Sequence, residues 1–268
     1  MFDPNMLKSI FDPNTLKVIK DLTPESTREL LFNPAANEVG KGVGALLSIL
    51  FSPLLALNVI EKQALAKFTN KIANKINKIP EEDQDFSKPG LALKALEEAR
   101  YQINNELLQD MFSSLLASGV NRQKNEDITP RYATVLSQIG YKDAVFLQEI
   151  NDQDYHYFPI GHMRHTNISK SEYIEVTDRY LCNNNNEVKR IPTESIDVLQ
   201  SLGIIQQEDN HYKTGGEFDK KYALLESYLQ TQDKYKANND NDIPFVRMIP
   251  GQIQPTDFGN HLLYCIFE

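Results

Sequence analysis

Three histidines stand close together in the segment HYFPIGHMRH, at His156, His162 and His165. Imidazole side chains bind zinc when further histidine, cysteine or carboxylate ligands stand at short, regular spacings. This cluster has no acidic residue or cysteine that matches the spacing of zinc ligands. We therefore predict exposed or hydrogen-bonded histidines on strands, and no metal site.

The other reactive residue types form no recognisable catalytic set. The segment KTGG at residues 213–216 lacks the strand-to-helix glycine frame of a phosphate-binding loop. The carboxylates at 81–83 and 97–98 fit solvated faces, and Cys265 stands in an apolar segment typical of a core. The chain contains no nucleophile elbow, Walker A motif or HExxH motif. The sequence thus predicts no catalytic residues and no cofactor.

The charge is unevenly distributed along the 268 residues. The net charge is −9, of which residues 1–60 carry −1 and residues 61–79 carry +4, so residues 80–268 carry −12. An acidic C-terminal half argues against general DNA binding, which needs clustered Lys and Arg to neutralise phosphates. Two cysteines and no apolar signal peptide indicate a reducing compartment, so we expect a cytoplasmic protein.

An apolar segment at residues 42–60 carries no charge and reaches the length of a membrane span. Small residues recur at every fourth position of this region, at Gly40, Gly44, Ser48, Ser52 and Ala56. Such a ridge lets a second helix approach closely, within a membrane or between protomers. Because Ser52 precedes Pro53, a helix-start pair, the segment also fits two short buried helices. We favour a buried or interface helix pair and keep inner-membrane contact as the alternative.

A basic amphipathic segment follows at residues 61–79. Its apolar positions share one helical face, at Leu65, Phe68, Ile72, Ile76 and Ile79. Its basic face consists of Lys67, Lys71, Lys75 and Lys78. Such a face suits an anionic membrane surface if the apolar segment before it inserts.

Residues 1–120 fit a helical domain with proline-started helices. The nearly repeated FDPN at residues 2–5 and 11–14 places Asp as an N-cap before a proline at the first helical position. The same device recurs at Thr129-Pro130. Helical periodicity covers residues 61–79 and 91–119, and two further helices are predicted at 129–140 and 141–150.

The pattern changes from about residue 155. The segments YHYFPI, MRHTNI and YIEVTDRY are rich in aromatic and β-branched residues and predict short strands. The segment IPTESIDVLQSL predicts a helix, followed by a hairpin across residues 208–210 and, at the end of the chain, a strand and a helix capped at Thr256. We expect a mostly α protein: a multi-helix domain at 1–120, then a winged-helix-like α+β domain at 121–268.

Five segments together resemble the abortive infection alpha family of bacterial proteins. They are NPAANEVGKGVGALLSILFSPL (33–54), ARYQINNELLQDMFSSLLASGVN (99–121), ITPRYATVLSQIGYKDAVFLQEI (128–150), LQSLGII (199–205) and IQPTDFGNHLLYC (253–265). The resemblance covers roughly residues 30–268. It implies a role in phage resistance and brings neither catalytic residues nor a cofactor.

Two hypotheses of function follow, with a third behind them. The first is a non-enzymatic anti-phage protein that contacts a phage or host protein, a second copy of itself or a membrane surface. The second is a winged-helix regulator that binds nucleic acid, which Glu194 and Asp197 on the proposed recognition helix disfavour. An enzyme with an unrecognised site is the third.

Overall fold

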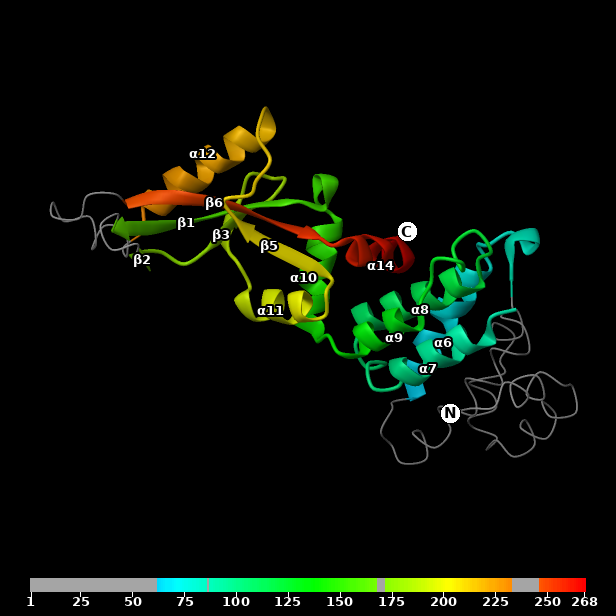
Figure 1. Ribbon diagram of the computed structural model, residues 1–268. Helices are drawn as coiled ribbons and strands as arrows, with labels where there is room; N and C mark the ends of the chain where they lie inside the picture. Colours follow the sequence, from blue (N-terminus) through cyan, green and yellow to red (C-terminus); the bar gives the residue numbers. More distant parts are fainter. Residues whose placement is uncertain (1–61, 86, 168–171, 233–245) are drawn as a thin grey trace, which may run out of the picture. The chain divides into compact units, whose positions relative to one another are not determined.

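The computed structural model describes residues 62–85, 87–167, 172–232 and 246–268 (Figure 1). The chain divides into two compact units. The first, here called the helical unit, ends at Ala144 and also takes in His261–Glu268; the second, the sheet unit, is Val145–Asn260. The divisions fall within helices α10 (Tyr141–Asn151) and α14 (Asp257–Phe267).

Among the described residues, the helical unit contains α6 (Lys62–Ile76), the short 3-10 helix η1 (Glu81–Asp83), α7 (Pro89–Ala99), α8 (Glu106–Val120) and α9 (Pro130–Ser137). The apolar face predicted for residues 61–79 is confirmed on α6, where Leu65, Phe68 and Ile72 are fully buried. This face packs against α8, and α7 packs against both α8 and α9. Burial of each large apolar side chain contributes about 1.5–3 kcal/mol.

The periodic segment at 91–119 forms two helices rather than one. The chain leaves the helix after Ala99, and Asn105 restarts it as the N-cap of α8. The side-chain oxygen of Asn105 accepts hydrogen bonds from the backbone N–H of Leu107 at 3.0 Å and of Leu108 at 3.2 Å. Such a cap stabilises a helix start by about 1 kcal/mol, and the apolar period continued across the break, so periodicity did not reveal it.

The sheet unit is built on one six-stranded sheet in which all pairs are antiparallel. Its strands are β1 (Phe158–Asn167), β2 (Glu172–Glu175), β3 (Tyr180–Cys182), β4 (Val188–Arg190), β5 (Ile205–Asp209) and β6 (Val246–Pro255). The strand order is β4-β3-β1-β6-β5, and β2 also pairs with β1. The long central pair β1 and β6 runs from Phe158 opposite Ile253 to His165 opposite Val246.

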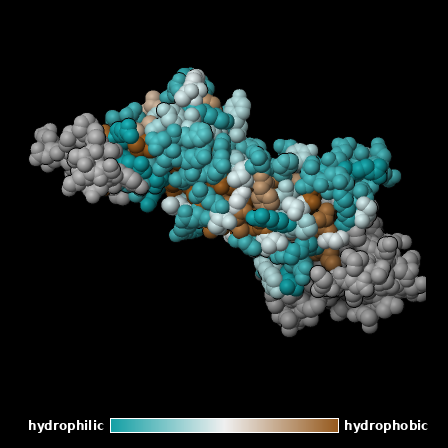
Figure 2. Space-filling view, in the orientation of Figure 1, coloured by the Kyte–Doolittle hydropathy of each residue, from teal (hydrophilic) through white to brown (hydrophobic). Residues whose placement is uncertain are grey.

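One face of the sheet carries helix α12 (Glu217–Gln230), which lies across β1 and β3 (Figure 1). Leu225 and Leu229 of α12 are fully buried there, and Leu229 packs with Met163 of β1. In the space-filling view the surface over α12 is mainly hydrophilic (Figure 2). Helix α11 (Thr193–Ser201) packs against β5, and the 3-10 helix η2 (Asp154–His156) precedes β1.

The prediction of a mostly α protein with a winged-helix-like domain is wrong. The structure combines helices with a six-stranded antiparallel sheet. The hairpin predicted across residues 208–210 does not form, because β5 takes β6 as its partner instead. After Asn210, which has a φ of 59°, the chain reaches Gly215 and Gly216 and enters α12. Because β6 lies about 40 residues beyond β5 in the chain, no local pattern in the sequence indicated that the two strands pair.

Two of the predicted helix starts are confirmed, at Thr129-Pro130 and at Thr256. Thr129 accepts a hydrogen bond from the N–H of Arg131 at 3.4 Å, with Pro130 in the first turn of α9. Thr256 accepts one from the N–H of Gly259 at 3.0 Å at the start of α14. Within the described ranges, no helix is both long enough and apolar enough to cross a membrane. The segment 42–60 and the FDPN repeat lie outside those ranges.

Candidate functional site

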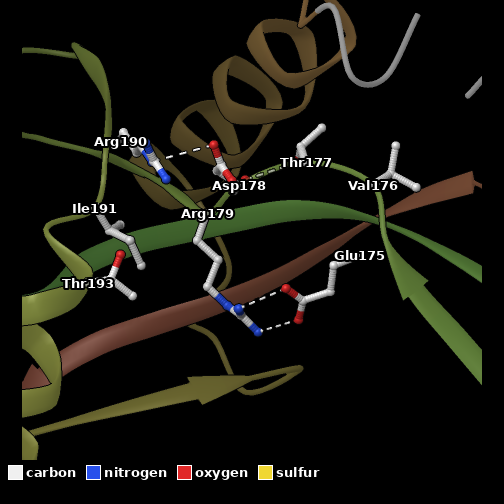
Figure 3. A pocket seen from close by; sticks show the side chains of 8 residues that line it. All are labelled: Glu175, Val176, Thr177, Asp178, Arg179, Arg190, Ile191 and Thr193. Carbon is white, nitrogen blue, oxygen red and sulfur yellow. Dashed lines mark hydrogen bonds and ion pairs between the residues drawn. The ribbon is translucent and has the colours of Figure 1, made fainter. Parts of the chain in front are cut away.

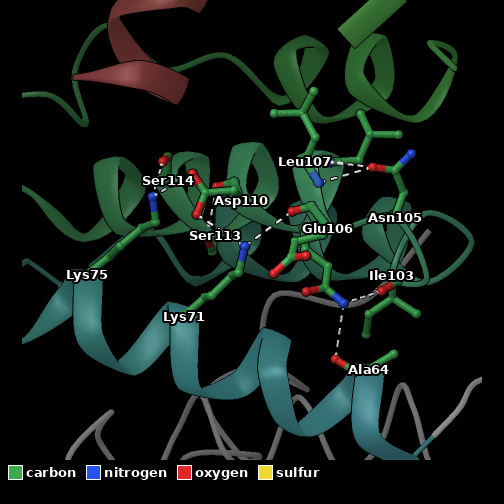
Figure 4. A network of polar contacts seen from close by, with 12 residues as sticks. Ala64, Lys71, Lys75, Ile103, Asn105, Glu106, Leu107, Asp110, Ser113 and Ser114 are labelled. Atoms are coloured by element: carbon green, nitrogen blue, oxygen red, sulfur yellow. Dashed lines mark hydrogen bonds and ion pairs between the residues drawn. The ribbon is translucent and has the colours of Figure 1, made fainter. Parts of the chain in front are cut away.

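Two of the four lysines on the basic face of α6 make contacts within the helical unit (Figure 4). The ammonium groups of Lys71 and Lys75 lie 3.5 Å and 3.2 Å from the carboxylate oxygens of Asp110 on α8. Lys75 also donates to the hydroxyl of Ser114 at 2.7 Å, and Lys71 donates to the carbonyl of Glu106 at 3.2 Å. These two lysines therefore join α6 to α8.

The other two lysines of that face, Lys67 and Lys78, are exposed. The basic face is thus divided between a helix–helix contact and solvent. The small-residue ridge of Gly40, Gly44, Ser48, Ser52 and Ala56 lies outside the described residues, so its role stays a prediction.

The three histidines do not form a cluster of ligands. His156 lies in η2, where its Nδ1 is 3.4 Å from Oδ1 of Asn260. His162 is fully buried on β1, and His165 is half-buried three residues further on. Over residues 62–85, 87–167, 172–232 and 246–268, no three His, Cys, Asp or Glu side chains are placed to hold a metal ion.

Both cysteines are buried thiols without a disulfide. Burial raises the pKa of Cys265 to about 11, and it also raises the pKa of Cys182. A thiol that stays protonated at neutral pH is a poor nucleophile. The expectation that Cys265 belongs to a core is confirmed, since only 1% of it is exposed.

The sheet unit contains a charged pocket that residue patterns did not reveal, here called the Arg179 pocket (Figure 3). It has a volume of about 490 Å³. Its lining combines charged, hydroxyl and aliphatic side chains: Glu175, Val176, Thr177, Asp178, Arg179, Arg190, Ile191 and Thr193. These residues come from β2, the segment between β2 and β3, the end of β4 and the start of α11.

The guanidinium of Arg179 is held by two carboxylates. It donates two hydrogen bonds to Glu175, at 3.2 Å and 2.9 Å, and one to Asp209 of β5 at 3.0 Å. Arg164 of β1 approaches the same carboxylates, at 3.7 Å from Glu175 and 3.4 Å from Asp209. The hydrogen bonds to Asp209 and Glu175 raise the pKa of Arg179 against the opposing effect of burial. This network fixes the side chain in one geometry, as bidentate pairs do.

His162 lies next to the network. Its Nε2 is 3.9 Å from a carboxylate oxygen of Glu175, and neither ring nitrogen has a hydrogen-bond partner among the described residues. Burial, with the positive charge of Arg179, lowers the pKa of His162 to about 4 although Asp209 and Glu175 oppose the shift. The ring is therefore neutral at physiological pH and adds no charge to the network.

The rim of the pocket is formed by a second ion pair. Arg190 lies 3.4 Å from Asp178 (Figure 3), and both side chains are more exposed than Arg179. Thr193, the first residue of α11, is exposed beside them. Two arginines and two carboxylates, Arg179, Arg190, Glu175 and Asp178, line the open pocket. Arg164 pairs with Glu175 and Asp209 pairs with Arg179, so three arginines and three carboxylates balance one another at the pocket and next to it.

The sequence held no signal for this site. Glu175 and Arg179 stand four residues apart in a segment predicted as a strand, where a rise of about 3.3 Å per residue would keep them too far apart to pair. They meet because β2 ends at Glu175 and the chain continues outside a strand to Arg179. The third partner, Asp209, is 30 residues further along the chain, so only the sheet topology brings it to Arg179.

The fold and site together define a protein of helices and one antiparallel sheet, with a preorganised charged pocket on that sheet. A model of the abortive infection alpha family matches residues 60–266, and the chain belongs to that family. The membership supports a function in abortive infection and confirms the family resemblance inferred from the sequence. No curated protein and no solved structure gave a significant match.

Proposed function

We propose that this protein acts in abortive infection as a non-enzymatic binding protein whose sheet unit recognises a phage or host protein at the Arg179 pocket. The observation that carries the proposal is the fixed guanidinium of Arg179, held by Glu175 and Asp209 in a pocket open to solvent. Groups that are already in place lose little conformational entropy when a partner binds.

The balance of charges in the pocket favours a polypeptide over a nucleic acid. Arg164, Arg179 and Arg190 each lie within ion-pair distance of a carboxylate, so they neutralise protein carboxylates and not phosphates. A nucleic-acid site needs an excess of basic groups. A peptide offers backbone N–H and C=O groups, a few charged side chains and aliphatic side chains. These groups match the carboxylate, hydroxyl and aliphatic lining of this pocket.

Membrane contact through the basic face is a weaker candidate. Lys71 and Lys75 are already engaged with Asp110, which leaves Lys67 and Lys78 for an anionic surface. At about 1 kcal/mol for each basic residue near a membrane, two lysines alone give weak binding. The same proposal gives the helical unit the role of carrying out the response after recognition, alone or together with a second copy of the chain.

A steric block at the rim tests the proposal. Thr193→Arg places a long side chain over the pocket while leaving the pairs of Arg179 in place. Gln200→Arg is the matched control, because Gln200 is an exposed residue of the same helix that does not line the pocket. Both variants add one positive charge.

Bacteria expressing each variant at equal levels are challenged with a phage that the unaltered protein restricts, and plating efficiency is measured. We expect Thr193→Arg to lose protection and Gln200→Arg to retain it. Full protection by Thr193→Arg, with its fold unchanged by circular dichroism, would contradict a role for the pocket.

A further inference from the structure

An arginine of the central strand β6 stands near the Arg179 pocket without lining it. In the register of the sheet, Arg247 is the direct partner of Arg164 on β1, and Arg164 is also the partner of Glu175 on β2. Residues directly opposite each other in a sheet point to the same face. Glu175, Arg164 and Arg247 therefore form one row across three neighbouring strands (Figure 1).

The next residue of β6 shows which face this is. Met248 packs with Met163 and Leu229 in the core cluster beneath α12. Because side chains alternate along a strand, Arg247 points to the opposite face, where the charged network lies, and it is exposed there. Neighbouring strands are about 4.8 Å apart, so the backbone of Arg247 lies roughly 10 Å from that of Glu175 at the pocket.

The charges on this face do not cancel. Arg179 lies 2.9 Å from Glu175 and 3.0 Å from Asp209. Arg164 approaches the same two carboxylates, at 3.7 Å and 3.4 Å. Arg247 has no ion-pair partner within the part of the chain that the structure describes. Around this network, three arginines thus face two carboxylates.

The position of Arg247 opposite Arg164 is unfavourable for folding. The Cβ atoms of directly opposed residues lie about 4.5–5.5 Å apart, and like charges at this separation destabilise a sheet. Such a violation is expected where a residue serves binding and not stability. Arginine suits that role, since its guanidinium can bind a carboxylate through two parallel hydrogen bonds.

We propose that Arg247 binds an acidic side chain, Asp or Glu, of the polypeptide that occupies the Arg179 pocket. This inference rests on the proposed function and specifies the chemistry of its partner. One excess positive charge matches a single carboxylate, whereas a phosphate group carries about two negative charges and would be repelled more strongly by Glu175 and Asp209. An extended chain advances about 3.3 Å per residue, so the acidic residue lies about three positions from the residue in the pocket.

Binding of the purified full chain to an array of random decapeptides tests the proposal. Both ends of each peptide are blocked, so a carboxylate can come only from a side chain. The peptides that bind the wild type should be enriched in Asp or Glu at one position. A charge-assisted contact of this kind should change the affinity by about tenfold or more.

Three variants assign the acidic preference to one residue. Arg247→Gln should weaken the binding of the acidic peptides by about tenfold or more, and Arg247→Glu should weaken it further because a carboxylate there repels the acidic side chain. Arg122→Gln, the same substitution at an exposed arginine of the helical unit, should leave binding unchanged. The melting temperature of Arg247→Gln should not fall, since the substitution relieves the repulsion from Arg164.

Thr193→Arg separates this inference from the proposed function. If Thr193→Arg abolishes peptide binding, but the bound peptides show no acidic preference or bind Arg247→Gln as tightly as the wild type, the inference alone is overturned. A lower melting temperature of Arg247→Gln would also overturn it, because Arg247 would then be paired within the chain. If no peptide binds the wild type, or if Thr193→Arg binds the peptides unchanged, the proposed function fails and the inference fails with it.

Discussion

Replacing Arg179 by methionine should destabilise the sheet unit by about 2–3 kcal/mol. The substitution removes three hydrogen bonds to carboxylates, two to Glu175 and one to Asp209. A hydrogen bond to a charged group contributes about 1.5–3 kcal/mol, and removing one partner of a fully buried ion pair costs about 3–5 kcal/mol.

Partial exposure reduces this figure. The side chains of Arg179, Asp209 and Glu175 are 24%, 22% and 40% exposed, so water replaces part of the lost interaction. Arg164 also remains within 3.7 Å of Glu175 and 3.4 Å of Asp209, and it continues to neutralise both carboxylates. For these reasons the expected loss lies below the range for a fully buried pair.

Arg190→Met is the matched control in the same pocket. Arg190 is 65% exposed and makes one contact with Asp178 at 3.4 Å. Exposed ion pairs of this kind contribute about 0–1 kcal/mol. The two substitutions are chemically identical and differ only in the surroundings of the arginine.

Amide hydrogen exchange of the full chain, read by mass spectrometry in peptides from β1 and β6, measures the stability of the sheet unit directly. Exchange in these strands should accelerate markedly for Arg179→Met and little for Arg190→Met. Equal effects of the two substitutions, or a loss below about 1 kcal/mol for Arg179→Met, would refute the view that this network holds the pocket in place.

Three further predictions concern other residues. The pKa of His162 is about 4 in the folded chain, so between pH 6.5 and 4 only the unfolded chain takes up this proton, and stability falls by at most about 3 kcal/mol. His162→Gln should remove this loss. Urea unfolding at both pH values measures it, and an equal loss in the variant and the wild type would contradict the prediction. Gly259→Ala should lower the melting temperature, because a Cβ there would overlap the carbonyl oxygen of Ile204. Gly119→Ala in α8, where a Cβ meets nothing within 4 Å, should stabilise the chain by about 0.5–1 kcal/mol. A melting temperature raised by Gly259→Ala, or lowered by Gly119→Ala, would contradict the corresponding prediction. Asp110→Asn should lower the free energy of unfolding by about 1 kcal/mol or less, because its ion pairs with Lys71 and Lys75 are partly exposed. The difference from the wild type should vanish in high salt. A salt-independent loss above about 2 kcal/mol would contradict this account of the contacts between α6 and α8.

Local signals in the sequence predicted local structure well. The buried face of α6 follows from the spacing of Leu65, Phe68 and Ile72, which are all fully buried. The helix starts at Thr129 and Thr256 follow from hydroxyl side chains that accept a nearby backbone N–H. Each of these features depends on residues within one or two helical turns, so composition and spacing are enough to reveal it.

The sheet and its pocket depend on contacts that sequence patterns do not encode. The pairing of β1 with β6 joins residues such as Ile160 and Gly251, about 90 positions apart. The preference for a nearby hairpin at residues 208–210 led to the incorrect winged-helix prediction. Gly251 also shows a steric requirement of the sheet, because a Cβ there would overlap the carbonyl oxygen of Glu208 on β5. The ion pair of Arg179 with Asp209 forms only once β5 lies in this sheet.

The most direct test of the central claim is phage yield per infected cell for two substitutions of Thr193. Thr193→Ala enlarges the Arg179 pocket and removes the hydroxyl, and Thr193→Arg obstructs it. If the pocket receives a segment of a protein partner, Thr193→Ala should restrict phage as the wild type does, and Thr193→Arg should release a yield close to that of cells without the protein. Equal yields from the two variants, at equal amounts of folded protein, would contradict recognition through this pocket.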